Sequence, residues 1–369
     1  GQPIGPGIGW QDLRTVGECI GARAEHGLVL APNQTATKAA WLLNHHGTGS
    51  SGELLLGTLD TWLVWNLTRG RSHVTDHTNA AITGLIELDG SAWSRSIIEA
   101  LGLQRLTLPH LVDSSGQIAP ASALPGAPII SGVAGDQQAS LIGQGCIAPG
   151  RAKCTFGTGG MLDMVTADGP PPRAGRLAHG TFPIVARSSG GLLSWGVESI
   201  MLTAGSAVDW LVDDLALLKN AAESGPLAAT VPDTDDVYFV PALMGLGTPH
   251  WDYGARGTLV GLTRGSTQAH VVRAVLEGIA HRTADLVEAA EADAHLTIPS
   301  LRVDGGMTAN HTFLQLVADA TGKVVEVAPQ TECTTLGAGY LAGLAVGLWD
   351  GVGAVADAWT PRQLLEPSD

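Results

Sequence analysis

The chain is 369 residues long, which exceeds the usual size of a single domain and favours two domains. Its 20 basic and 35 acidic residues give a net charge of −15, which argues against nucleic acid and anionic membrane surfaces as partners. Hydrophobic residues make up 44%, but no run reaches the roughly 18 apolar residues of a membrane span. No signal peptide is recognisable and the four cysteines form no CxxC pair, so we expect a cytoplasmic protein without membrane insertion.

The first part of the chain mixes apolar and polar segments. Residues 37–45 predict a helix, and the apolar residues 54–66 predict a second one. The polar residues 74–83 predict a loop that lines something. The apolar run 127–133 predicts a buried strand that stops at a glycine-rich turn.

Strands and helices alternate in the remainder, which indicates the α/β class. The turn at residues 147–150 is a candidate hinge. The expected strands are 152–156, 161–165, 191–197, 237–241, 301–303 and 324–327, and the expected helices are 206–219, 269–294, 308–321 and 335–348.

One carboxylate, Asp136, follows the strand that ends at residue 133. Delivered into a cleft, it would suit a general base that takes the proton of a hydroxyl during phosphoryl transfer, a reaction governed mostly by positioning and charge stabilisation. Asp136 could instead cap the helix that follows it. Both roles are compatible at a strand-to-helix junction.

Two further glycine-rich turns could bring backbone N–H groups to phosphate. They are residues 155–160 (TFGTGG) and residues 304–306 (DGG), the second followed by Asn310. Taken alone, both segments are more typical of plain turns, because glycine adopts positive φ at little cost. No Walker A sequence, GxGxxG unit or GxSxG elbow occurs, which disfavours P-loop proteins, Rossmann dehydrogenases and α/β-hydrolases.

Taken together, these turns resemble those of the carbohydrate (FGGY) kinase family. One family signature is present at residues 257–262 (GTLVGL) with 270–277 (HVVRAVLE), and another, imperfect, at 35–45 (TATKAAWLLNH). Residues 57–65 (GTLDTWLVW) and 336–344 (LGAGYLAGL) are similar to those of the members that phosphorylate glycerol. The resemblance covers essentially the whole chain.

The resemblance implies two actin-like (ribonuclease H-like) domains around a cleft, residues 1–146 and 147–369. It implies ATP-dependent phosphorylation of glycerol to glycerol 3-phosphate, with Asp136 as catalytic base near Mg²⁺, and a homo-oligomer. By position, the substrate-binding residues would be Trp10, Asn33, Asp136, Gln137 and Leu202, and the ATP-binding residues Gly157, Thr158, Gly159, Gly265, Gly306, Met307 and Asn310. Trp10 taken alone is more typical of a core residue.

Departures from the family pattern leave alternatives open. The family's opening strands have no counterpart before the block at Trp10, so we expect the first domain to be incomplete. Asn33 stands where a substrate-lining Tyr is usual, and Leu202 where a Phe is usual. Residues 124–128 lack the elements with which some relatives bind a regulatory sugar bisphosphate. The alternatives are a kinase of another polyol or sugar, and a non-catalytic remnant that only binds nucleotide.

Overall fold

The computed structural model describes residues 1–47, 52–166, 169–170 and 175–368. Its centre is a nine-stranded mixed sheet with the strand order β15-β14-β13-β7-β8-β10-β9-β5-β6. The strands are β5 (Ser115–Pro120), β6 (Ile129–Gly132), β7 (Ala152–Phe156), β8 (Gly160–Val165), β9 (Phe182–Ser189), β10 (Leu192–Met201), β13 (Ser300–Asp304), β14 (Val324–Val327) and β15 (Gln363–Leu365).

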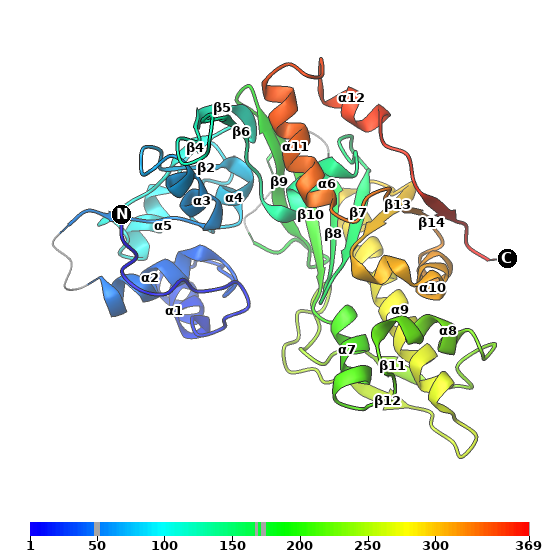
Figure 1. Ribbon diagram of the computed structural model, residues 1–369. Coiled ribbons are helices and arrows are strands. Elements are labelled where there is room, and N and C mark those ends of the chain that lie inside the picture. Colours follow the sequence, from blue (N-terminus) through cyan, green and yellow to red (C-terminus); the bar gives the residue numbers. More distant parts are fainter. Residues whose placement is uncertain (48–51, 167–168, 171–174, 369) are drawn as a thin grey trace.

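Helices cover both faces of this sheet, which makes the fold α/β (Figure 1). The helices that follow residue 112 are α6 (Asp136–Gly143), α7 (Gly205–Asp213), α8 (Ser224–Ala228), α9 (Gln268–Ala294), α10 (His311–Thr321), α11 (Cys333–Ala345) and α12 (Val352–Asp357), with 3-10 turns η1 (Ala221–Glu223) and η2 (Gly306–Ala309). The short strands β11 (Tyr238–Val240) and β12 (Thr258–Val260) pair beside α7.

An N-terminal part, residues 1–112, lies beside the β5–β6 end of the sheet (blue to cyan in Figure 1). It holds α1 (Val16–His26), α2 (Thr35–His46), α3 (Leu59–Leu67), α4 (His77–Ala81), α5 (Arg95–Ala100) and the parallel strand pairs β1 (Leu54–Leu55) with β3 (Leu106–Thr107) and β2 (Val74–Asp76) with β4 (His110–Val112). A separate apolar cluster that includes Ala36, Leu43, Leu85 and Leu103 forms its core.

The two faces of the central sheet differ because side chains alternate along each strand. On β7 and β8, residues Cys154, Phe156, Leu162 and Met164 belong to the main core, which packs against α7, α9 and α10. The residues between them face the opposite side, where α6 and α11 lie. Lys153 on that side is fully buried and directly paired with Asp163.

Two glycines allow α6 and α11 to approach closely. A Cβ atom on Gly337 of α11 would lie 1.7 Å from the Ala139 carbonyl oxygen of α6. A Cβ atom on Gly143 of α6 would lie 2.0 Å from the Cys333 carbonyl oxygen. Neither position has room for a side chain, so the backbone contact fixes α6 against α11.

The sheet has a seam between β5 and β9, where a single parallel pair, Ser115 with Ser189, joins the strands. Side chains complete the contact: the Ser114 amide donates to Ser188 Oγ at 2.9 Å, and the Ser188 amide donates to Ser114 Oγ at 3.0 Å. α11 crosses the same region, where Ser115 Oγ donates to the Leu341 carbonyl at 2.8 Å. The seam is therefore held mainly by hydroxyl groups and by α11.

Several expectations from the sequence are confirmed. The hairpin β7–β8 surrounds the glycine turn, α2 and α9 match their predicted ranges within two residues, and β13, α10, β14 and α11 follow in the expected order. α9 begins with a capping box, in which the Thr267 amide donates to His270 Nδ1 at 3.0 Å. No helix among the described residues is long and apolar enough to cross a membrane.

Other expectations are wrong. Residues 74–81 of the predicted loop form β2 and α4, because Asp76 caps α4 by accepting hydrogen bonds from the amides of Thr78 and Asn79. The predicted helix 54–66 starts only at Leu59, after β1. The N-cap of α6 is Gly135, so Asp136 is the first helical residue and not the cap.

Candidate active site

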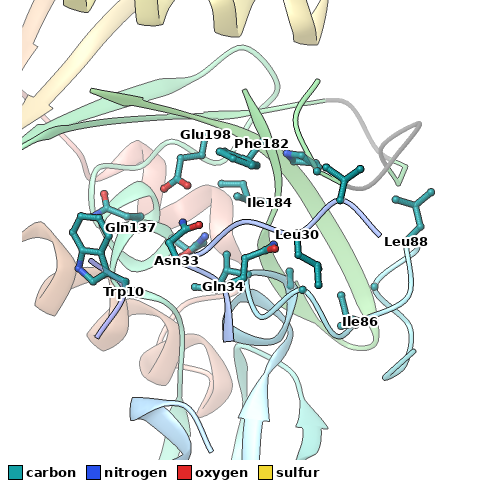
Figure 2. Close-up of a pocket in the computed structure, with 18 of the residues that line it drawn as sticks. Trp10, Leu30, Asn33, Gln34, Ile86, Leu88, Gln137, Phe182, Ile184 and Glu198 are labelled. Carbon is teal, nitrogen blue, oxygen red and sulfur yellow. The ribbon is translucent and has the colours of Figure 1, made fainter. Parts of the chain in front are cut away.

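A cavity of about 360 Å³ lies between the N-terminal part and the sheet. Polar side chains gather at one end of it and apolar side chains at the other (Figure 2). The polar end holds Trp10, Asn33, Asp136, Gln137 and Glu198. The apolar end includes Leu30, Ile86 and Leu88.

Asp136 and Gln137 enter this cavity because α6 begins there. The strand β6 and the turn through Gly135 deliver them, and the Asp136 side chain is exposed. Asp136 Oδ1 accepts a hydrogen bond from the Gln137 amide at 2.8 Å. Its second carboxylate oxygen has no hydrogen-bond partner among the described residues and is available to a ligand.

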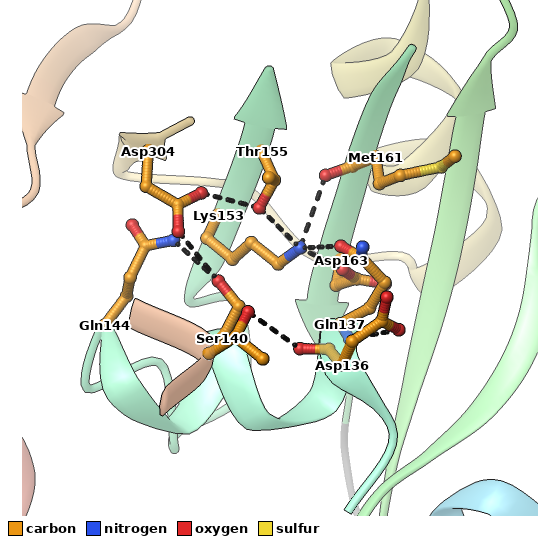
Figure 3. A network of polar contacts seen from close by, with 10 residues as sticks. Asp136, Gln137, Ser140, Gln144, Lys153, Thr155, Met161, Asp163 and Asp304 are labelled. Carbon is orange, nitrogen blue, oxygen red and sulfur yellow. Dashed lines mark hydrogen bonds and ion pairs between the residues drawn. The ribbon is translucent and has the colours of Figure 1, made fainter. Parts of the chain in front are cut away.

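Buried Lys153 fixes the side chain of Gln137 (Figure 3). Its Nζ donates to Gln137 Oε1 at 2.5 Å and to Thr155 Oγ1 at 3.0 Å, and lies 2.6 Å from Asp163 Oδ2. An ammonium group can only donate, so the Gln137 oxygen must face Lys153 and its NH₂ group is left for the cavity.

The same network reaches the DGG turn. Thr155 Oγ1 donates to Asp304 Oδ1 at 2.5 Å, and Ser140 Oγ of α6 donates to Asp304 Oδ2 at 3.0 Å. Burial alone would lower the pKa of Lys153, but the Asp163 and Asp304 carboxylates outweigh it and raise that pKa. The ammonium form of Lys153 therefore links the start of α6 to the start of the DGG turn.

Trp10 and Asn33 both line the cavity, and Trp10 is 53% exposed, so it is not the core residue that its type suggests. The Gly9 and Trp10 carbonyls accept hydrogen bonds from Lys38 Nζ at 2.6 and 3.2 Å. These bonds tie the segment before α1 to α2 and hold Trp10 at the cavity.

Leu202 is not brought together with the other substrate residues. It does not line the cavity but lies beside Gly159 and Gly247, whose Cβ positions fall within 3.6 Å of its atoms. Met161 and Glu198 line the cavity instead, and sequence reasoning missed both. The alternation of side chains along a strand is the only sequence feature that could have identified them. Met161 lies two residues before Asp163, and Glu198 is two residues from Ile200, which also lines the cavity.

The turn between β7 and β8 carries the predicted phosphate residues. Gly157 and Thr158 are exposed, and a Cβ atom on Gly157 would meet no atom within 4 Å. Their carbonyls accept hydrogen bonds at 2.9 Å from the amides of Gly205 and Ala204, at the start of α7. Gly159 is closed in, because its Cβ would lie 2.5 Å from the Met201 carbonyl oxygen.

The DGG turn lies next to this hairpin. A Cβ atom on Gly305 would be 2.4 Å from the Phe156 carbonyl oxygen, whereas one on Gly306 would meet nothing. Met307 lies 3.8 Å from the Cβ position of Gly205. The open backbones of Gly157 and Gly306 are thus near each other, next to α7.

Asn310 has a structural role in this arrangement. Its Oδ1 accepts a hydrogen bond from the Phe313 amide at 3.0 Å and caps α10, while its Nδ2 donates to Ser224 Oγ at 3.1 Å. Gly265 lies apart, in an exposed turn after β12 where its amide donates to Thr263 Oγ1 at 3.1 Å. Within the described ranges, no hydrogen bond joins Gly265 to the other predicted nucleotide residues.

The donor groups suit Mg²⁺ bound through a nucleotide. The described residues contain no group of three or more His, Cys, Asp or Glu side chains that could hold a metal by themselves. Asp304 already accepts two hydrogen bonds, whereas Asp136 has a free carboxylate oxygen. One carboxylate together with phosphate oxygens and water is a donor set that Mg²⁺ commonly uses.

Comparison with known proteins agrees with this picture. Residues 1–143 match the N-terminal domain model of the FGGY family of carbohydrate kinases, and residues 152–346 match its C-terminal domain model. Glycerol kinase from Trichlorobacter lovleyi is 45% identical, with 100% of this chain and 76% of that protein covered. Glycerol kinase 2 from Thermotoga maritima is 42% identical over the same shares of the two chains.

Solved structures show the same fold. The Plasmodium falciparum glycerol kinase with ADP superposes with a TM-score of 0.87 at 28% identity, covering 97% of this chain and 74% of the other. The ligand-bound xylulose kinase of Lactobacillus acidophilus gives a TM-score of 0.84 at 22% identity, covering 98% and 75%. The architecture is thus the two-domain, actin-like one of these kinases, and the chain belongs to the FGGY family of carbohydrate kinases.

Proposed function

We propose that this protein transfers the γ-phosphoryl group of ATP to the 3-hydroxyl of glycerol, forming glycerol 3-phosphate. The observation that carries the proposal is the continuous network from Gln137 through Lys153 and Thr155 to Asp304. It couples the polar end of the cavity to the turn beside the open backbones of Gly157 and Gly306. Relatives more than 40% identical over the whole chain are glycerol kinases.

Asp136 is the general base of this proposal. It would accept the proton of the attacking hydroxyl while the new O–P bond forms and ADP leaves. Trp10, Asn33 and Gln137 would bind the acceptor. Mg²⁺, held through Asp136 and the phosphates, would neutralise charge on the transferred group.

The nucleotide would lie over the β7–β8 turn and the DGG turn. Gly157, Thr158 and Gly306 offer exposed backbone there. Gly159, Gly265, Met307 and Asn310 are included on the family resemblance, and Asn310 would act through its position, since its side chain already caps α10. Leu202 is left out of the acceptor site because it does not line the cavity.

The division at residue 146 stays a prediction. The same holds for a hinge at residues 147–150, a homo-oligomeric state and a cytoplasmic location, which rest on the family resemblance or on the sequence alone.

Asp136→Asn tests the proposal. We expect ADP formation from MgATP in the presence of glycerol to fall about 100- to 10,000-fold, because the amide cannot take the proton. The matched control is Asp350→Asn, at an exposed position outside the cavity, which should retain turnover. Near wild-type turnover in Asp136→Asn would contradict the assignment.

A second candidate is a kinase of another polyol or sugar, favoured by the polar side chain of Asn33 in a cavity of about 360 Å³. Comparing glycerol with tetritols and ketopentoses decides between the two. Preference for a longer acceptor, again lost in Asp136→Asn, would support the second candidate. Nucleotide binding without turnover on any acceptor would support a non-catalytic protein.

A further inference from the structure

A row of charged residues runs across five neighbouring strands on the α6 face of the sheet. Direct register pairs join Glu326 of β14 to Arg302 of β13, Arg302 to Lys153 of β7, Lys153 to Asp163 of β8, and Asp163 to Glu198 of β10. Residues in direct register project to the same face. The five side chains therefore form one continuous row.

The cations of this row are already matched with other carboxylates. Arg302 Nε lies 3.1 Å from Glu326 Oε2, and Lys153 Nζ lies 2.6 Å from Asp163 Oδ2. Glu198 is the remaining acid at the end of the row. Among the described residues, its carboxyl has neither a hydrogen-bond partner nor a cation of its own. A carboxyl without such partners is costly to keep ionised away from water.

The row ends at the cavity. Phe182 of β9 is the direct partner of Glu198 on its other side and carries no charge. Glu198 lines the cavity with Asp136 and Gln137, and Figure 2 shows its carboxyl group pointing toward the same polar end as Gln137 and Asn33. Since no hydrogen bond joins Glu198 to another described residue at this end, its carboxyl group is available to a bound molecule or to water.

We propose that Glu198 is a further acceptor-binding residue, whose carboxyl group donates a hydrogen bond to a hydroxyl of the polyol and so helps to select the substrate. This inference rests on the proposed function, since it adds a residue to the same acceptor site. The functional groups complement one another: Asp136 accepts, the Gln137 NH₂ group donates, and a protonated Glu198 both donates and accepts. A vicinal diol offers one donor and acceptor at each carbon.

The charges around Glu198 keep it protonated. Burial, together with the Asp163 and Asp136 carboxylates and against the attraction of Lys153, raises the pKa of Glu198 from 4.5 to about 8. Glu87 is a further acid that lines the same cavity. Glu198 is thus a neutral donor near pH 7 and becomes an anion, unable to donate, as the pH rises through about 8.

The test compares Glu198→Leu with Glu198→Gln, which keeps a neutral hydrogen-bond donor. We expect the KM for glycerol to rise about tenfold in Glu198→Leu, with the KM for MgATP unchanged, because one hydrogen bond is lost from a partly buried group. Glu198→Gln should recover most of that affinity. Glu99→Leu, on an exposed part of α5, is the matched control.

The pH profile separates a binding role from a purely structural one. For the wild type, the KM for glycerol should rise between pH 7 and 9, and this rise should be absent in Glu198→Gln. Equal KM values in wild type and Glu198→Leu would overturn the inference, as would a rise that persists in Glu198→Gln.

A binding measurement separates failure of the proposed function from failure of the present inference. Glycerol binding without turnover is followed by the fluorescence of Trp10 and Trp195, which both line the cavity. A wild type that forms no ADP overturns the proposed function. The present inference is then decided by binding alone: it stands if the Leu variant binds polyol more weakly, and it falls if that binding is unchanged or no polyol binds.

Discussion

The two faces of the central sheet are made by alternate residues of the same strands, yet they have opposite chemistry. Toward α9 and α10, β7 and β8 present Cys154, Phe156, Leu162 and Met164, all fully buried among apolar neighbours. Toward α6, the residues in between include Lys153 and Asp163, which are equally buried but charged. Burial alone therefore does not mark a stabilising core: one face holds the fold together, while the other adjoins the cavity of the proposed acceptor site.

The largest expected effect comes from removing the buried lysine of the charged face. Lys153→Met leaves Asp163 buried without its cation, and we expect the free energy of unfolding to fall by about 3–5 kcal/mol. Because Gln137 also loses its donor, turnover should fall as well. Urea unfolding measures the first effect, with Lys219→Met, at an exposed lysine, as control. A free energy of unfolding within about 0.5 kcal/mol of wild type would show that leaving Asp163 buried without its cation costs little.

A comparable loss of stability without a specific effect on the acceptor is expected on the apolar face. Leu162→Ala leaves a cavity against the core and should lower the free energy of unfolding by about 2–5 kcal/mol. At a temperature where the variant is folded, its KM for glycerol should match that of wild type. Leu192→Ala, at a residue that is 78% exposed, controls for the substitution itself. A selective change of KM in Leu162→Ala would erase the contrast between the faces.

The contact between α6 and α11 sharpens the comparison. Gly337→Ala places a methyl group against the Ala139 carbonyl and should cost about 1–3 kcal/mol, while displacing the start of α6 and lowering kcat. Gly339→Ala lies in the same helix with no atom within 4 Å, so it should be neutral or stabilise by up to about 1 kcal/mol. Similar melting temperatures for the two variants would refute this close approach.

The last prediction concerns the pH dependence of stability. The folded pKa of Glu198 is raised from 4.5 to about 8, so between these values the folded chain keeps a proton that the unfolded chain has released. Its contribution to stability is therefore complete below about pH 4.5 and is lost as the pH rises through 8. The urea midpoint of wild type, relative to Glu198→Gln, should decline over this interval. A constant difference would show that Glu198 titrates normally.

Much of the framework could be predicted from local sequence. The hairpin β7–β8 and the helix α9 follow from a glycine turn, strand alternation and helical periodicity, and Asp136 from an apolar strand that ends in glycine. The loop predicted for residues 74–83 is wrong, because Thr75, Asp76 and Thr78 are polar but buried, and their partners include Ser114 far along the chain. Local polarity suggested a loop where distant hydroxyl groups stabilise a strand and a helix.

The acceptor site was only partly predictable for the same reason. Glu198 is one acid within a strand, and no feature of its neighbours in sequence distinguishes it from a solvent-exposed residue. The role proposed for Glu198 follows only from the register of β7, β8 and β10, which also places Lys153 against Asp163. Leu202 and Met161 show the converse: family position suggested the first residue, whereas strand geometry places the second at the cavity.

The seam between β5 and β9 has a mechanical consequence. Separating β5 from β9 would break one backbone pair and the hydrogen bonds between Ser114 and Ser188. Separating β7 from β8 would break a ladder of five residue pairs. α11 spans the junction of β5 and β9, since it packs on β6 at Gly132 and on α6 at Gly337. We therefore expect the sheet to bend more easily between β5 and β9 than elsewhere, with α11 as the axis of the bend. Slow deuterium uptake at the amides of Ser114 and Ser188 would show that the sheet does not bend between β5 and β9.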